Sequence, residues 1–165
     1  EVHVQVLEAR KLVDIQALGK QDPYVKVTLV AGGGKGRAKV SFESSRTKQI
    51  ENAGPNPSWE EDLLLGYSEE ALGLLDGHFG STPFLYVEVW DANVKLLGDK
   101  LIGRTILPVF PFILDGGQVA DAWYPLLNGS GKSMGQLHIG AQFRRKGEEK
   151  RTLVSELPEN TLNVV

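Results

Sequence analysis

The stretch that decides the fold reads Val87-Glu-Val-Trp-Asp91-Ala-Asn93-Val-Lys-Leu-Leu-Gly-Asp99-Lys-Leu-Ile-Gly103. Its first residues alternate between apolar and other side chains, which predicts a β-strand that buries one face. The strand leads into a loop in which Asp91, Asn93 and Asp99 supply oxygen-bearing side chains. Ca²⁺ prefers several oxygen ligands, and loops held by a rigid scaffold can present them, so this loop is a candidate metal site.

The same alternation recurs along most of the chain and predicts further strands of the same kind. Clusters of Gly and Pro separate these segments, as turns between strands require. The expected strands cover residues 2–7, 24–29, 39–50, 58–65, 84–90, 101–107, 123–127 and 136–143. Eight short strands with such turns predict an antiparallel β-sandwich.

Two segments depart from the strand pattern. Residues 68–75 predict a short helical insertion, because Ser68 can cap a helix whose first turn carries Glu69 and Glu70. A cluster of charged residues begins at Arg144. We therefore expect one domain over residues 1–144 and a C-terminal tail or linker over residues 145–165.

Composition narrows the classes of function. The 165 residues suffice for one domain with a real core, and the formal net charge of −3 gives no basic field that would attract nucleic acid. The absence of Cys excludes a disulfide scaffold, a thiolate zinc site and a Cys nucleophile. The three His show no spacing that suggests a nucleophile with its base, so we expect no enzymatic activity.

The chain carries no targeting segment that its sequence reveals. No apolar run approaches the roughly 18–20 residues that a membrane span needs, and no signal-peptide pattern is visible. We expect a cytoplasmic location on this basis. Because the chain begins with Glu1 rather than Met, we also expect it to be part of a longer protein.

Four motifs together resemble the C2 domain, a family of β-sandwich modules that bind calcium and phospholipid. The first is the stretch quoted above, and the second is Asp-Pro-Tyr-Val over residues 22–25. The others are Asn-Pro-Ser-Trp-Glu-Glu over residues 56–61 and Trp-Tyr-Pro-Leu over residues 123–126. The resemblance implies an all-β, eight-stranded antiparallel C2-type β-sandwich. The order of strands is similar to the second of the family's two circularly permuted forms.

The resemblance also implies a calcium site, which this chain retains only in part. The family's five carboxylate positions correspond to Gln16, Asp22, Asp91, Asn93 and Asp99, so two of the five are amides. An amide oxygen can bind a cation but adds little Coulomb attraction. We therefore expect calcium binding to be weak or absent, with the three aspartates converging at one end of the sandwich.

A second implied site is a concave sheet face that binds anionic lipid. The residues that correspond to it are Tyr24, Lys26, Arg46, Lys48 and Trp90. Cations on alternate residues of one strand share a face, and such a face can hold phosphate groups beside an aromatic ring.

Apolar residues at the loop tips complete the functional prediction. Leu96 and Leu97 are exposed candidates for insertion into the membrane interface. The sequence thus predicts a targeting module that binds anionic phospholipid membranes peripherally, with weak or absent calcium dependence. The alternative is a calcium-independent protein–protein interaction or scaffold module.

Overall fold

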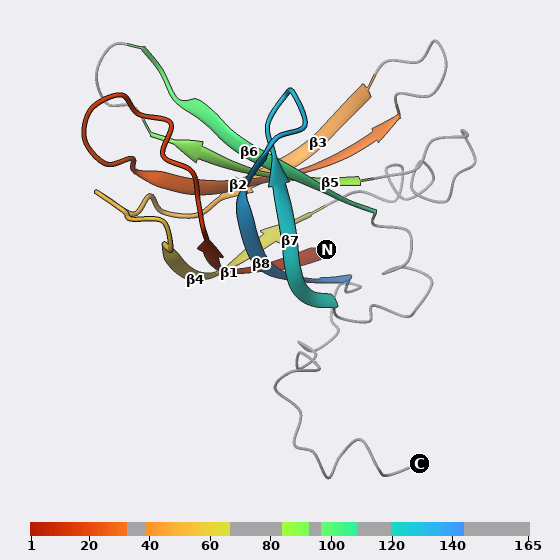
Figure 1. Ribbon diagram of the computed structural model, residues 1–165. Coiled ribbons are helices and arrows are strands. Elements are labelled where there is room, and N and C mark those ends of the chain that lie inside the picture. The colour runs from red at the N-terminus through yellow and green to blue at the C-terminus, as the bar shows by residue number, and fades with distance from the viewer. Residues whose placement is uncertain (33–38, 67–83, 93–96, 109–119, 144–165) are drawn as a thin grey trace, which may run out of the picture.

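The computed structural model describes residues 1–32, 39–66, 84–92, 97–108 and 120–143. Within these ranges the chain forms antiparallel strands and no helix, which confirms the predicted all-β class (Figure 1). The helix expected over residues 68–75 and the tail expected over 145–165 lie outside the described residues. The eight strands are β1 (Val2–Arg10), β2 (Pro23–Gly32), β3 (Lys39–Arg46), β4 (Ser58–Leu65), β5 (Phe84–Asp91), β6 (Lys100–Pro108), β7 (Ala120–Leu127) and β8 (Ser133–Phe143).

The strands follow the order β3-β2-β5-β6-β7-β8-β1-β4, and the sheet folds over in the middle to make two layers (Figure 1). At the fold, β6 and β7 share only the pair Arg104 and Leu127. Gly103 lies next to this pair, and a Cβ there would meet Cβ of Leu126 at 3.0 Å and Cβ of Met134 at 3.2 Å. Only glycine therefore lets the two layers approach so closely at the corner.

The core lies between the two layers, where the alternating apolar side chains meet. Val4, Val27, Val87 and Ile139 are fully buried examples from four different strands. Trp59 also lies in the core, and its indole Nε1 donates to the carbonyl of Pro23 at 3.2 Å. Because each fully buried Val or Leu contributes roughly 1.5–3 kcal/mol, this cluster supplies a rigid support for the loops.

Antiparallel pairing gathers every second connection at one end of the sandwich. These connections are residues 11–22, 47–57, 92–99 and 128–132, which we call the loop end. The turn at residues 128–132 closes as a hairpin, with the amide of Gly131 donating to the carbonyl of Asn128 at 3.0 Å.

The strand expected over residues 39–50 is shorter than predicted. β3 ends at Arg46, and the chain beyond it turns toward the loop end. There the amide of Lys48 donates to the carboxylate of Glu61 at 2.9 Å, and the amide of Ile50 donates to the carbonyl of Pro23 at 3.0 Å. These bonds replace the regular ladder, so Lys48 follows the strand instead of lying within it.

Candidate functional site

Asp91, the last residue of β5, is the most buried carboxylate of the loop end, with 1% of its surface exposed. Its Oδ1 accepts a hydrogen bond from the backbone amide of Asp22 at 2.8 Å. Its Oδ2 accepts one from Nε2 of Gln16 at 2.7 Å. A carboxylate removed from water needs such donors, and here residues 11–22 satisfy both of its oxygens.

Asp22 joins three of the loop-end segments through its backbone and side chain. Its carboxylate Oδ1 accepts a hydrogen bond from the amide of Asn52 at 2.7 Å. Its carbonyl accepts one from the amide of Ala92 at 3.0 Å, next to the bond with Asp91. Asp22 therefore stabilises the loop end as a structural junction without any added ion.

Asp99 faces a different neighbour. Its Oδ2 accepts a hydrogen bond from the hydroxyl of Tyr24 at 2.5 Å. Burial of Tyr24, together with this hydrogen bond and the nearby Asp99 charge, raises the pKa of the tyrosine to about 12. The phenol therefore remains a protonated donor at neutral pH, and one oxygen of Asp99 is engaged with β2.

Four of the five residues expected to bind calcium, Gln16, Asp22, Asp91 and Asp99, reach the same end of the sandwich. Among the described residues, no three Asp, Glu or His side chains form a group that could hold a metal ion. Gln16 presents an amide N–H₂ to Asp91, which is a donor and not a ligand. Asn93 lies outside the described residues. The donor set of Gln16, Asp22, Asp91 and Asp99, as it is arranged here, does not fit a calcium ion.

Residues 13–21 are held in place by a buried glutamine that sequence reasoning missed. Oε1 of Gln21 accepts from the amide of Ile15 at 3.2 Å, and its Nε2 donates to the carbonyl of Val13 at 2.9 Å. Asp14 adds a local turn, because its Oδ1 accepts from the amide of Gln16 at 2.9 Å. A single Gln in a loop has no sequence pattern, so only the geometry reveals this role.

The outer face of β2, β3 and β5 carries four of the five predicted lipid-site residues. Tyr24 lies opposite Trp90 in the register, and Lys26 lies opposite Arg46. The guanidinium carbon of Arg46 lies 3.5 Å from the centre of the Tyr24 ring. We call Tyr24, Lys26, Arg46 and Trp90 the basic face. The fifth residue, Lys48, is exposed beyond the end of β3.

Glu88 is an acidic neighbour of the basic face, as is Asp99, and both are already bonded. Glu88 lies opposite both Lys26 and Arg104 in the register. Oε2 of this buried glutamate accepts from Nη2 of Arg104 at 2.5 Å and from its Nε at 3.0 Å. Among the described residues, Lys26 has no ion-pair partner and the buried Nε1 of Trp90 has no acceptor. The ammonium of Lys26 is thus an unmatched cation on this face.

The loop end also exposes apolar tips. Leu18 is 90% exposed and Leu97 is 74% exposed, and Val13, in the same connection as Leu18, is exposed as well. Leu96 lies outside the described residues. Exposed lysines lie at the same end of the sandwich, and sequence reasoning missed all of them except Lys48. They are Lys11, Lys20, Lys48, Lys100 and Lys132.

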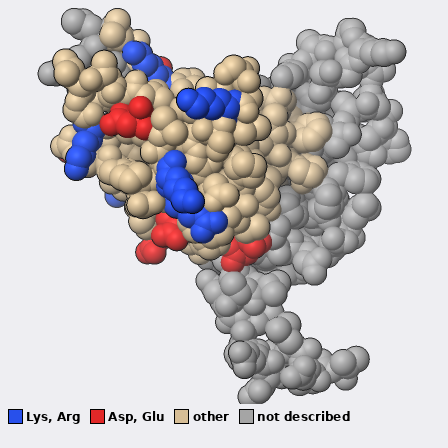
Figure 2. All heavy atoms as spheres, in the orientation of Figure 1, with Lys and Arg blue, Asp and Glu red and all other residues tan. Residues whose placement is uncertain are grey.

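These lysines come from three of the connections and from the first residue of β6, which are far apart in the sequence, so only the fold places them at one end. Figure 2 shows one side of the molecule, where cationic side chains are spread among acidic and uncharged ones instead of forming a single block. Electrostatic attraction to an anionic surface is therefore the sum of several modest local contributions.

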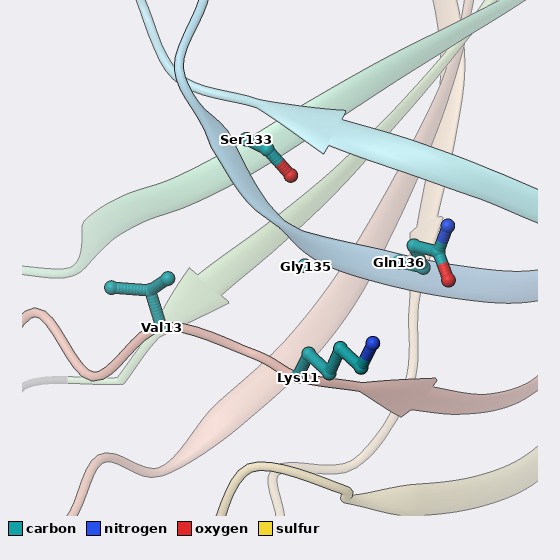
Figure 3. Close-up of a pocket in the computed structure, with 5 residues that line it drawn as sticks. All are labelled: Lys11, Val13, Ser133, Gly135 and Gln136. Carbon is teal, nitrogen blue, oxygen red and sulfur yellow. The ribbon is translucent and has the colours of Figure 1, made fainter.

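A shallow hollow of about 280 Å³ lies where β1 leaves the sheet and β8 begins (Figure 3). The backbone approaches unusually closely there: a Cβ on Gly135, whose φ is +124°, would meet Cα of Leu12 at 2.9 Å. The hollow adds a cation and two polar groups to the loop end. Its lining residues are Lys11, Val13, Ser133, Gly135 and Gln136.

Comparison with known proteins agrees with this arrangement of strands and loops. The family model described as C2 domain matches residues 1–126. The chain belongs to the C2 domain family. A C2 and GRAM domain-containing protein of Arabidopsis thaliana is 31% identical over 150 residues, which cover 88% of this chain and 12% of the relative. Synaptotagmin-5 of the same plant is 28% identical over 123 residues, which cover 74% of this chain and 18% of the relative.

Solved C2 domains share the fold. A C2 domain of a plant extended synaptotagmin 1 superimposes with a TM-score of 0.58 at 20% identity, covering 87% of this chain and 95% of that one. A calcium-bound pair of C2 domains from extended synaptotagmin 2 gives 0.58 at 19% identity, covering 86% and 44%. This C2 domain thus spans only a small part of the two curated relatives named above. No helix among the described residues is long and apolar enough to cross a membrane.

Proposed function

We propose that this C2 domain binds anionic phospholipid membranes peripherally, through its loop end and its basic face. The observation that carries the proposal is the exposure of Leu18 and Leu97 at the end where five exposed lysines also gather. Large apolar side chains exposed beside cations are typical of surfaces that enter a membrane interface. Its similarity to synaptotagmin-5 and to extended synaptotagmin domains supports the same interpretation.

The expected attachment is marginal and reversible. Burial of one leucine side chain contributes roughly 1.5–3 kcal/mol, and each Lys or Arg near an anionic surface contributes about 1 kcal/mol. Several such contributions oppose the cost of association, so neither group suffices alone. We propose action at the cytoplasmic leaflet, because anionic lipids concentrate there.

The proposed binding has weak or absent dependence on calcium. Asp91 and Asp22 already have hydrogen-bond donors on their oxygens, and Asp99 is bound to Tyr24. A calcium ion would have to displace these bonds before it could bridge the loops to lipid phosphates. The affinity should therefore lie at the weak end of protein calcium sites, with a Kd on the order of 10⁻⁴ M or above.

Liposome sedimentation tests the proposal. Vesicles of phosphatidylcholine with and without phosphatidylserine are compared in calcium and in chelator. We expect the domain to sediment with the anionic vesicles in both solutions. The double variant L18S/L97S should lose at least tenfold in affinity, because two apolar insertions are removed.

A matched control variant separates insertion from general surface polarity. Leu64 is also exposed, but it lies on β4 opposite His3, at the far end of the sandwich. Leu64→Ser should leave sedimentation unchanged. If the wild-type domain ignores anionic vesicles in both solutions, the membrane proposal fails and a protein-interaction module takes its place.

A further inference from the structure

We propose that the side-chain amide of Gln16 stands in for a cation at the loop end. In this role it joins residues 11–22 to Asp91 and lets the loops assemble without metal. A carboxylate at this position would make the stability of the domain respond to calcium. The inference explains the calcium independence proposed above, but its test needs no membrane, so the two can fail separately.

The contact between Gln16 and Asp91 carries the inference. Nε2 of Gln16 lies 2.7 Å from Oδ2 of a carboxylate that is almost wholly buried. The amide N–H₂ carries partial positive charge and donates, so it supplies what a buried carboxylate otherwise takes from a cation. The two residues are separated by 75 positions in the sequence, so the bond joins two different loops.

The rest of the loop holds the Gln16 amide in position. Its backbone N–H donates to Asp14, and the buried side chain of Gln21 fixes the neighbouring backbone at Val13 and Ile15. Gly19 has a φ of +81°, and a Cβ added there would lie 3.9 Å from Oε1 of Gln16. The amide is thus pre-positioned and does not have to be ordered by a ligand.

A carboxylate in place of this amide would reverse the electrostatics. The side chain at position 16 would then bring a negative charge against Asp91, with Asp22 next to it. Like charges at hydrogen-bond distance destabilise one another unless a cation lies between them. With a glutamate at position 16, the loop end would hold four carboxylates, at positions 16, 22, 91 and 99. Such a group is more similar to the set of oxygen ligands that Ca²⁺ requires.

Thermal unfolding of four proteins tests the inference in chelator, in 1 mM calcium and in 1 mM magnesium. Gln16→Glu keeps the shape of the side chain and replaces the donor by an acceptor. We expect its Tm to fall by about 3–10 °C in chelator and to recover in calcium. The wild-type Tm should rise in calcium by much less than that of the variant, because any calcium it binds is held weakly.

Two further variants act as controls. Gln16→Ala removes the donor without adding charge, so its Tm should fall in chelator and stay low in calcium. Gln136→Glu adds the same charge where the side-chain oxygen already accepts from Nε of Arg10 at 2.6 Å, so calcium should have no effect. If Gln16→Glu does not fold in chelator, refolding it in calcium gives the same comparison.

Three outcomes would overturn the inference. The first is a Gln16→Glu variant as stable in chelator as the wild type, because the amide would then contribute nothing. The second is a destabilised Gln16→Glu variant that calcium does not restore. The third is a wild-type Tm that rises in calcium as much as that of the variant.

Discussion

The guanidinium of Arg46 stacks over the ring of Tyr24 at 3.5 Å from the ring centre, at the middle of the basic face. The hydroxyl on the same ring donates a hydrogen bond to Asp99. The two contacts join β3, β2 and the connection before β6, so the basic face and the loop end form one connected surface.

Arg46 should contribute to stability through its planar group and to membrane binding through its charge. Arg46→Lys keeps the charge but loses the stacking geometry. We expect it to retain most liposome binding while its free energy of unfolding falls by about 0.5–1 kcal/mol. Arg46→Ala should lower both the liposome binding and the free energy of unfolding. Equal liposome binding by Arg46→Ala and the wild type would remove Arg46 from the lipid site.

Tyr24 should make the fold sensitive to alkali. Its pKa is raised from 10.0 to about 12 in the folded chain, so the folded state favours the protonated phenol. The resulting stabilisation is fully present below about pH 10 and is lost as the pH rises toward about 12. Urea unfolding at pH 9 and pH 11 should show a smaller loss of stability in Tyr24→Phe than in the wild type. An identical loss in both proteins would contradict this role.

Arg104 should be needed to keep Glu88 from binding Lys26. Arg104→Ala leaves a buried carboxylate without its main donor, and we expect the free energy of unfolding to fall by about 1–3 kcal/mol. Lys26 is then the nearest cation in the register, so liposome binding should weaken as well. Adding Glu88→Gln to this variant should recover part of both losses. Liposome sedimentation and urea unfolding of the double variant test whether both losses are partly recovered.

Gly103 should be essential to the corner between the layers. Gly103→Ala places a Cβ 3.0 Å from that of Leu126, and overpacking of this kind costs about 1–3 kcal/mol. Gly129→Ala is the matched control, because a Cβ there meets nothing within 4 Å. Thermal unfolding should separate the two variants clearly. A Gly103→Ala variant as stable as the control would mean that the corner adjusts freely.

The strands and their common end were predictable because they depend on local sequence. Alternation fixes which residues of β2 and β5 are buried, and antiparallel pairing then brings the regions of Asp22, Asp91 and Asp99 to one end. The error at the end of β3 has a different origin. Lys48 bonds to Glu61 on a strand that follows it, and no local pattern reports such a partner.

The internal bonds of the loop end could not be predicted from the sequence. The contact of Gln16 with Asp91 and that of Tyr24 with Asp99 each span 75 positions. Side-chain hydrogen bonds between residues so far apart in the sequence depend on strand register, sheet twist and rotamer together. A sequence can show that an amide replaces a carboxylate, but only the fold shows that its nitrogen turns toward the remaining acid.

The bond between Gln16 and Asp91 has a consequence for timing in the cell. A domain whose loops assemble only around a bound ion needs both a rise in calcium and a suitable bilayer before it binds. A module whose loops are closed by its own amide responds only to the bilayer. On the proposed function, its residence on a membrane would follow the anionic lipid content of that membrane, and brief calcium signals would change it little.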